Sequence, residues 1–215
     1  MFHLSRFIWN VVPVSKKGAV SGKTEDQTTG RRVRSDAQHS VEVLLQAAKE
    51  VFATSGVDAP VRAIAEKAGV GVGTLYRHFP QRSDLVSAVF RHEVDACAAA
   101  GPVLAAQFQP GEALAKWMDR FVDFVGTKRG LHSALHSGNP AFNPLPDLFG
   151  QRLVPALRSL LEAAAAAGEI RADVDAGDLL YAAANICRSA YDVGPEHAKR
   201  MVGLLVDGLR YGGSR

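Results

Sequence analysis

The chain has 215 residues, 47% hydrophobic and 22% charged, a composition typical of a globular protein with room for one or two domains. The first 91 residues carry 13 basic against 8 acidic side chains, and a basic N-terminal part favours contact with a polyanion. The two cysteines have no short spacing, which argues against a disulfide framework or a cysteine zinc module. We expect both to be small buried apolar residues of a cytoplasmic protein.

We predict that residues 1–34 form a disordered, basic N-terminal extension, because they are polar over long stretches and have no helical periodicity. The apolar run FIWNVVPV near the start is too short to span a membrane. It is either part of this extension, a membrane-surface or targeting segment, or sequence upstream of the true start of the protein.

The apolar spacing is helical almost throughout and strand patterns are nearly absent, so the sequence predicts an all-α fold. A first helix is expected to begin at Ser35, which fits a capping box with Gln38, and to end at Gly56. A second helix then precedes Gly69, and a third is stopped by Pro80. The expected core positions are Val41, Leu44, Leu45, Ala48, Phe52, Val61, Ile64, Ala65, Ala68, Val72, Leu75 and Phe79.

These three helices make a predicted domain over residues 35–81, followed by a second, all-helical domain over residues 82–215. The fourth helix is expected to run from Arg82 to about Ala100 and to end at Gly101–Pro102. The remaining helices are expected over residues 111–127, 131–137, 147–167, from Asp173 or Asp175 to 191, and 196–211, with a loop over 138–146.

The stretch from Val61 to Phe79 predicts a helix-turn-helix, because two short amphipathic helices are joined by a tight turn at Gly69. A helix enters the major groove when its exposed residues are small or can hydrogen-bond to base edges and phosphates. The candidate DNA-binding residues are Arg62, Gly71, Gly73, Thr74, Tyr76, Arg77, His78 and Arg82.

Within the third helix, Gly73 allows close approach to the duplex, and Thr74 offers a hydroxyl to a base or phosphate and a methyl group to thymine. Arg77 and His78 are expected to reach phosphates. The Tyr76 hydroxyl either binds a phosphate or lies in solvent while its ring packs in the core.

The flanking helices contribute two further arginines. Arg62 lies where the second helix is expected to cross the DNA backbone. Arg82 lies in the first turn of the fourth helix, where backbone N–H groups favour an anion. The alternative is that Arg82 and His78 are ordinary solvated surface.

These residues resemble the N-terminal signature of the TetR family of bacterial transcriptional regulators over about Val41 to Leu85. The resemblance implies a homodimer, a palindromic operator and repression that a small molecule relieves. The family usually has Ser or Thr where Gly71 stands, so a helix cap and a phosphate contact are lost, and Lys where Arg82 stands. The matching residues are Ala47-Ala48, Phe52, Gly56, Ile64-Ala65, Ala68-Gly69-Val70, Gly73-Thr74-Leu75-Tyr76, His78-Phe79 and Leu85.

The extension before the first helix is longer than the family needs. Its basic residues Arg31, Arg32 and Arg34 form either an arm that reaches the minor groove or backbone, or a solvated tail.

The resemblance also implies that residues 35–81 are the helix-turn-helix DNA-binding domain and residues 82–215 a helical-bundle ligand-binding and dimerisation domain. In the second domain, the last two helices would pair with their copies in a four-helix dimer interface. Each of these helices is apolar over more than one stripe, so a face packed inside the monomer is a compatible alternative. The predicted interface residues are Leu179, Ala183, Ile186, Cys187, Ala190, Met201, Leu204, Leu205 and Gly208.

A ligand pocket is expected among the helices between Arg82 and Tyr191. Its aromatic stripe is either pocket lining or core. His132 and His136 share a helix face and could hold a metal, but no carboxylate follows at a short helical spacing, so we expect no metal and no cofactor. The candidate ligand-binding residues are Trp117, Phe121, Phe124, His132, His136, Phe142 and Asn185.

The residues predict a cytoplasmic, nucleoid-associated DNA-binding regulator with no membrane partner, and the resemblance implies that it is a repressor that binds its operator as a homodimer and responds to a small molecule. The sequence contains no Ser/His/Asp order, phosphate-binding glycine loop or metal motif, so we expect no enzyme. The alternatives are a helical interaction module and a non-specific DNA-binding protein with a degenerate recognition helix.

Overall fold

The computed structural model describes residues 27–127, 138–190 and 193–210, and within these ranges every regular element is a helix, which confirms the predicted all-α fold. None of these helices is long and apolar enough to cross a membrane. In chain order they are α1 (Gln27–Ser55), α2 (Val61–Lys67), α3 (Val72–His78), α4 (Arg82–Gln107), α5 (Pro110–Thr127), the 3₁₀ helix η2 (Pro140–Phe142), α7 (Leu145–Ala166), α8 (Ala176–Ser189) and α9 (Pro195–Gly208).

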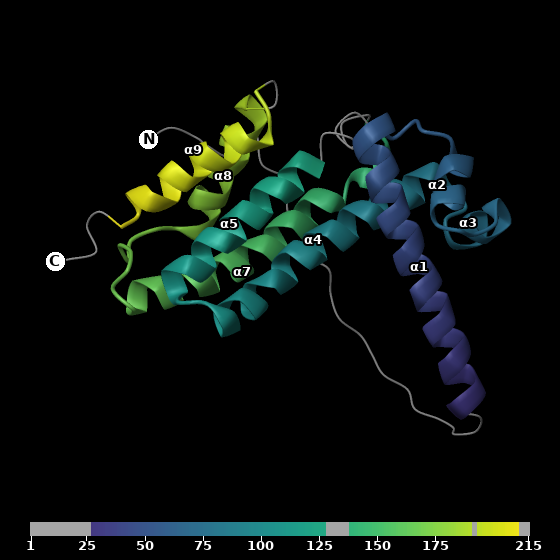
Figure 1. Cartoon of the computed structure of the whole chain (residues 1–215), viewed down its shortest axis with the longest axis horizontal. Helices are drawn as coiled ribbons and strands as arrows, with labels where there is room; N and C mark the ends of the chain where they lie inside the picture. Colours follow the sequence, from purple (N-terminus) through teal and green to yellow (C-terminus); the bar gives the residue numbers. More distant parts are fainter. Residues whose placement is uncertain (1–26, 128–137, 191–192, 211–215) are drawn as a thin grey trace.

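The helices α1, α2 and α3 form a three-helix unit at one end of the molecule, and α8 and α9 lie at the other end (Figure 1). The long helix α4 begins at the three-helix unit and continues into the bundle, where it packs against α5 and α7. Helix α5 in turn contacts α8 and α9. Helix α4 therefore connects the three-helix unit to the bundle, because it packs against helices of both.

The three-helix unit is held together by one apolar face from each helix. Phe52 of α1, Ile64 of α2 and Leu75 of α3 are each at most 1% exposed. Such burial removes most of each side chain from water, which stabilises the unit by roughly 1.5–3 kcal/mol per side chain. Two glycines with positive φ, Gly56 (76°) and Gly69 (67°), end α1 and shape the turn after α2, as the sequence predicted.

The start of α1 differs from the expectation. The sequence predicted a cap at Ser35 with Gln38, but the backbone is helical from Gln27, so Ser35 lies inside the helix. A capping serine needs a non-helical backbone at its own position, whereas each residue added to an existing helix gains a hydrogen bond. Residues 27–34 therefore belong to α1 and not to a disordered extension. Residues 1–26 lie outside the described part of the chain.

Helix α4 does not end at Gly101–Pro102 but continues to Gln107. A residue before proline normally avoids the helical region because its Cβ clashes with the proline ring, and Gly101 has no Cβ. Gly101 is buried, and a Cβ there would lie 3.8 Å from Trp117 Nε1 of α5. Trp117 Nε1 also donates to the carbonyl of Cys97 at 2.9 Å, one turn before the proline. Packing on α5 therefore keeps α4 helical through a proline that would otherwise end it.

The predicted helices of the C-terminal part are found close to their expected bounds. Helix α8 follows Asp175, whose carboxylate accepts hydrogen bonds from the backbone N–H groups of Gly177 (2.8 Å) and Asp178 (3.0 Å). The loop predicted over residues 138–146 is wrong in part. Asn139 caps η2 by accepting from the N–H of Ala141, and α7 already begins at Leu145. The helix predicted over 131–137 lies outside the described residues.

Candidate DNA-binding site

The turn between α2 and α3 is built on Gly69. Its backbone N–H donates to the carbonyl of Glu66, and that of Val70 donates to the carbonyl of Ala65, both at 3.0 Å. A φ of 67° makes a side chain at position 69 unfavourable, while the side chain of Val70 packs against the core. The predicted glycine turn is therefore confirmed, and it fixes the direction in which α3 leaves α2.

Helix α3 is anchored through one side only. Leu75 is 1% exposed and Phe79, just past the helix, is 7% exposed. Tyr76 is 50% exposed, so its ring is not part of the core. None of the other α3 candidates is buried: Gly71, Gly73 and Arg77 are exposed, and Thr74 and His78 are half-buried. The structure thus brings these six candidates together, and their contact with DNA remains a prediction.

One predicted core residue of α3 is not in the core. Val72 was expected to be buried beside Leu75, but it is 37% exposed. Val72 is the first residue of a short helix, and the preceding turn contributes Val70 to the core instead. Val72 therefore adds an apolar group to the exposed surface of α3, where sequence periodicity alone placed it inward.

The glycines of α3 are not required by packing within the chain. A Cβ built on Gly71 or on Gly73 meets no atom within 4 Å. Gly71 is the N-cap residue of α3, with an extended backbone (φ −71°, ψ 146°) and no side-chain hydrogen bond to the helix start. The start of α3 therefore has no side-chain cap, as expected from the glycine at position 71.

The two candidate arginines outside α3 have different surroundings. Arg62, the second residue of α2, is exposed. Arg82, the first residue of α4, is half-buried, and its guanidinium donates to the carbonyl of Val57 and, at 2.8 Å, to that of Ala59. The structure therefore engages the Arg82 guanidinium with the α1–α2 connection, whereas the sequence predicted a phosphate contact.

The start of α4, where the sequence analysis expected an anion, has an acidic side chain of its own. Gln81 is the N-cap residue, and its backbone N–H donates to the carboxylate of Asp84 at 2.9 Å in a capping box. This carboxylate places a negative charge at the positive end of the helix dipole. Contact of Arg82 with a phosphate stays a prediction.

A charged cluster that the sequence analysis missed joins α1 to α4. The ammonium of Lys49 lies 2.7 Å from the carboxylate of Glu93, whose side chain is only 7% exposed. His92 lies 3.3 Å from Glu42 and 3.5 Å from Glu93. The sequence could have revealed this cluster through Glu93. This acidic residue falls on the apolar face of α4 between Phe90 and Val94, and a charge buried on such a face needs a partner.

The predicted ligand pocket is a packed core in this structure. Trp117 and Phe121 are fully buried and stack with ring centroids 6.0 Å apart, and Phe124 is 4% exposed. Phe149 of α7, which the sequence analysis did not select, lies 6.2 Å from Phe121 and 6.1 Å from Phe124. Phe90 of α4 adds a third helix to these contacts, with its ring centroid 6.1 Å from that of Phe124. The predicted aromatic stripe is therefore packed core in this structure.

The other predicted pocket residues have different surroundings. Phe142 is 7% exposed in η2. Asn185 of α8 donates to the carbonyl of Tyr181 at 2.9 Å and accepts from Arg188, so its amide serves its own helix. His132 and His136 lie outside the described residues. Among the residues that the structure describes, no group of three or more His, Cys, Asp or Glu side chains could hold a metal ion.

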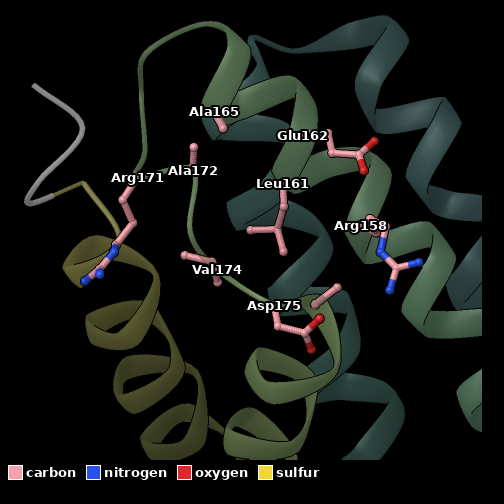
Figure 2. Close-up of a pocket in the computed structure, with 9 residues that line it drawn as sticks. Arg158, Leu161, Glu162, Ala165, Arg171, Ala172, Val174 and Asp175 are labelled. Carbon is pink, nitrogen blue, oxygen red and sulfur yellow. The ribbon is translucent and has the colours of Figure 1, made fainter. Parts of the chain in front are cut away.

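A hollow of about 320 Å³ lies between α7 and the segment that leads into α8 (Figure 2). Two of its charged groups are already engaged, since Arg171 pairs with Asp173 at 2.5 Å and Asp175 caps α8. None of the predicted ligand-binding residues lines it. The lining residues are Arg158, Leu161, Glu162, Ala165, Arg171, Ala172, Val174, Asp175 and Ala176.

The predicted dimer interface divides into two faces. Leu179, Ala183, Cys187 and Ala190 are at most 4% exposed, so they pack inside the monomer and are removed from the predicted interface. The physical reason is that α8 contacts α5, α7 and α9, which together cover these positions. The remaining predicted residues are on the outer face: Met201, Leu204 and Gly208 are exposed, and Ile186 and Leu205 are half-buried.

The outer face of α8 and α9 contains one large residue that the sequence analysis missed. Tyr181 of α8 is 57% exposed, and Met201 and Leu204 of the following helix, α9, are 40% and 68% exposed. The signal for Tyr181 was its position four residues before Asn185, on the face of α8 opposite Ala183. We call Tyr181, Ile186, Met201, Leu204, Leu205 and Gly208 the outer face of α8 and α9.

Both cysteines are buried free thiols, as the sequence predicted. Burial raises the pKa of the Cys97 thiol to about 12 and that of the Cys187 thiol to about 11. A thiol with a raised pKa is a poor nucleophile at neutral pH, so both behave as apolar packing groups.

Two family models match the chain. A model described as bacterial regulatory proteins of the tetR family matches residues 44–89. A model described as the C-terminal domain of SbtR-like transcriptional regulators matches residues 109–211. The first match contains α2, α3 and the residues of the glycine turn, and the second contains α5 to α9.

Solved structures and curated proteins agree with these models. A TetR transcriptional regulator from Streptomyces coelicolor is 40% identical, with a TM-score of 0.69, over 79% of this chain and 98% of that chain. A TetR transcription regulatory protein from Mycobacterium vanbaalenii is 34% identical, with a TM-score of 0.63, over 83% and 99%. An HTH-type transcriptional regulator of Staphylococcus aureus (strain USA300) is 36% identical over 64 residues, which is 29% of this chain and only 35% of that relative.

Proposed function

Because the chain belongs to the TetR family of bacterial transcriptional regulators, we propose that it binds a palindromic operator as a homodimer and represses transcription until a small molecule releases it. The observation that carries the proposal is the surface of α3. Leu75 anchors the helix in the core, while Tyr76 and Arg77 are exposed and Gly73 leaves room for the duplex. Binding the chromosome would place the protein in the cytoplasm.

Each exposed group of α3 has a separate role in this proposal. The glycines at 71 and 73 let the backbone approach the major groove, and Thr74 contacts a base edge. Tyr76, Arg77 and His78 bind phosphates, and Arg62 binds the backbone from the start of α2. Phosphate contacts set affinity and salt dependence, whereas the base contact sets sequence preference.

The test starts from a random duplex library, from which the wild-type protein selects its preferred sequence. We expect a palindrome whose half-sites lie about one helical turn apart, ~34–36 Å. The double variant Tyr76→Ala with Arg77→Ala should bind this sequence more weakly and with a smaller salt dependence. Unchanged, salt-insensitive binding by the double variant would contradict the proposal and favour a helical interaction module. Equal affinity for scrambled DNA would favour non-specific binding.

A homodimer is supported by the outer face of α8 and α9. Leu204 and Tyr181 expose large apolar surface on two neighbouring helices, and such surface is usually covered by a partner. In a two-fold dimer the same patch of both copies meets, which gives a four-helix contact. Because these side chains are exposed in the monomer, changing them should leave the monomer fold intact.

The dimer is tested by Leu204→Glu, which we expect to be monomeric in analytical ultracentrifugation because it buries two charges at the contact. The matched control is Val103→Glu on α4, because Val103 is also an exposed apolar residue (54%, against 68% for Leu204). The control should remain dimeric. A dimeric Leu204→Glu protein would contradict the placement of the interface.

Release by a small molecule would act through α4, which begins at the three-helix unit and continues into the bundle. A ligand that binds one tilt of α4 more tightly shifts the population towards it and changes the distance between the two recognition helices. A regulator of the same fold, FadR from Bacillus subtilis (18% identity, TM-score 0.58), was solved in complex with stearoyl-CoA. A ligand that bound tightly but left operator affinity unchanged would contradict this mechanism.

Repression is tested separately from DNA binding. A reporter gene placed behind the selected operator should be expressed less when the wild-type protein is present, and the Tyr76→Ala, Arg77→Ala variant should restore expression. Increased expression with the wild-type protein would identify an activator and leave operator binding unaffected.

A further inference from the structure

The connection between α1 and α2 is fixed from two sides. The side chains of Val57 and Ala59 are buried, at 6% and 4% exposure, and pack in the core of the three-helix unit. Their backbone carbonyl groups accept hydrogen bonds from the two terminal nitrogens of the Arg82 guanidinium. One guanidinium therefore serves two backbone acceptors that lie two residues apart.

This arrangement depends on the shape of the arginine side chain. A guanidinium presents its N–H donors in a rigid planar fork, whereas the ammonium of lysine is a single point donor on a flexible chain. The fork can hold both carbonyls at once, and a lysine at position 82 would hold one at a time. Because Arg82 is the first residue of α4, the fork joins the start of α4 to the corner that leads into α2 and then α3.

We propose that Arg82 is a positioning residue, which transmits the tilt of α4 to the recognition helix α3 and does not bind phosphate. The proposal rests on the operator-binding homodimer proposed above. In that dimer the two copies of α3 must match half-sites at a fixed separation, and a loose joint between α4 and α2 would let that separation vary. Lys49 and Glu93 hold the side of α1 to α4, but Arg82 holds the corner nearest to α2.

The two roles of Arg82 predict different salt dependences. If Arg82 binds phosphate, removing it lowers the slope of log affinity against log salt by about 0.9 per contact, which is nearly two for a dimer. If Arg82 positions α3, removing it lowers affinity and leaves the slope unchanged. The variant Arg77→Ala, which removes an exposed arginine of α3, provides the control with the reduced slope.

The roles also differ in their dependence on half-site spacing. Arg82→Ala, Arg82→Lys and the wild-type protein are measured on the selected operator and on versions with one or two base pairs inserted at its centre. We expect Arg82→Ala to bind the selected operator about tenfold more weakly but to lose less affinity on insertion, because its recognition helices are less fixed. Arg82→Lys keeps the charge but not the fork, so it should show the same flattened spacing preference.

A measurement without DNA tests the joint itself. The backbone amide of Gly56 donates to the carbonyl of Phe52 at the end of α1, and that of Ala59 donates to the carbonyl of Gly56 within the connection. Hydrogen exchange at both amides should be about tenfold faster in Arg82→Ala than in the wild-type protein. Should Arg82→Ala fail to fold, Arg82→Lys decides the question by its spacing preference and its hydrogen exchange.

A reduced salt slope with unchanged spacing preference and unchanged exchange would overturn the proposal and make Arg82 a phosphate contact. Unchanged values in all three measurements would overturn it as well. If the wild-type protein selects no DNA sequence, the proposed function fails, and the exchange measurement still decides whether Arg82 holds the connection.

Discussion

The carboxylate of Glu93 in α4 lies 2.7 Å from the ammonium of Lys49 in α1, with only 7% of the Glu93 side chain exposed. Lys49 is 27% exposed, so water reaches one partner and hardly reaches the other. His92 lies 3.5 Å from the same carboxylate and 3.3 Å from Glu42. Charged side chains of α1 and α4 therefore hold the three-helix unit to α4, in addition to the hydrogen bonds of Arg82 with the α1–α2 connection.

The asymmetry of this pair predicts unequal effects of removing each partner. Lys49→Met leaves a buried carboxylate without its cation and should lower the free energy of unfolding by about 3 kcal/mol. Glu93→Gln leaves only a partly exposed ammonium, which water can solvate, and should lower it by about 1 kcal/mol. Urea unfolding monitored by circular dichroism measures both.

The control for this pair is Lys67→Met, which breaks the exposed ion pair with Glu50 (2.8 Å). Exposed pairs contribute little, so we expect a change within about 0.5 kcal/mol. Equal losses for Lys49→Met and Lys67→Met would show that the burial of Glu93 does not matter for stability.

The proline inside α4 predicts a stabilising substitution. Pro102 is exposed and lacks the N–H that would donate to the carbonyl of Ala98, so Pro102→Ala should raise the free energy of unfolding by about 1–3 kcal/mol. The same substitution at Pro195, the first residue of α9, should lower it slightly, because proline suits that position and restricts the unfolded chain. Thermal unfolding of both variants gives the two signs, and a lower Tm for Pro102→Ala would contradict the argument.

Alanine substitutions at two glycines near α3 should change stability in opposite directions. Gly73 has a helical backbone and open space around it, so Gly73→Ala should raise the free energy of unfolding by about 0.5–1 kcal/mol. The same methyl group would stand between α3 and the duplex, so operator affinity should fall. Calorimetry and gel shift measure the two quantities, and a stabilised variant with full affinity would place the DNA contact elsewhere.

The comparison for this prediction is Gly69→Ala. The φ of 67° at Gly69 makes a side chain unfavourable, so we expect a loss of about 1–2 kcal/mol in stability. Because a Cβ there meets no atom within 4 Å, the loss comes from the backbone alone, and Gly69→Asn should lose less.

The uncapped start of α3 predicts a gain from serine. In Gly71→Ser the hydroxyl can accept a backbone N–H at the helix start, where the extended conformation at position 71 already suits a capping residue. Stability should rise by a few tenths of a kcal/mol, about the difference between serine and glycine caps. Operator affinity should rise with it if the hydroxyl also binds a phosphate. Gly71→Ala, which has no hydroxyl, is the control, and an equal gain with alanine would exclude capping as the cause.

The features that the sequence determined are local ones. The turn at Gly69, the missing cap at Gly71, the cap at Asp175 and the apolar faces of most helices follow from a residue and its neighbours within a few positions. Backbone conformation and helix periodicity are properties of short segments, so the helix-turn-helix and the all-α fold could be predicted from them.

The remaining features were decided by contacts between distant segments. Packing of Gly101 on Trp117 keeps α4 helical past Pro102, and two carbonyls of the α1–α2 connection engage Arg82. The tertiary structure also shows that Trp117 and Phe121 are core and that only one face of α8 and α9 remains outside. Periodicity reports that a helix face is apolar, but not which neighbour covers it. That is set by long-range packing, and so only the tertiary structure could assign the core, the joint at Arg82 and the outer face.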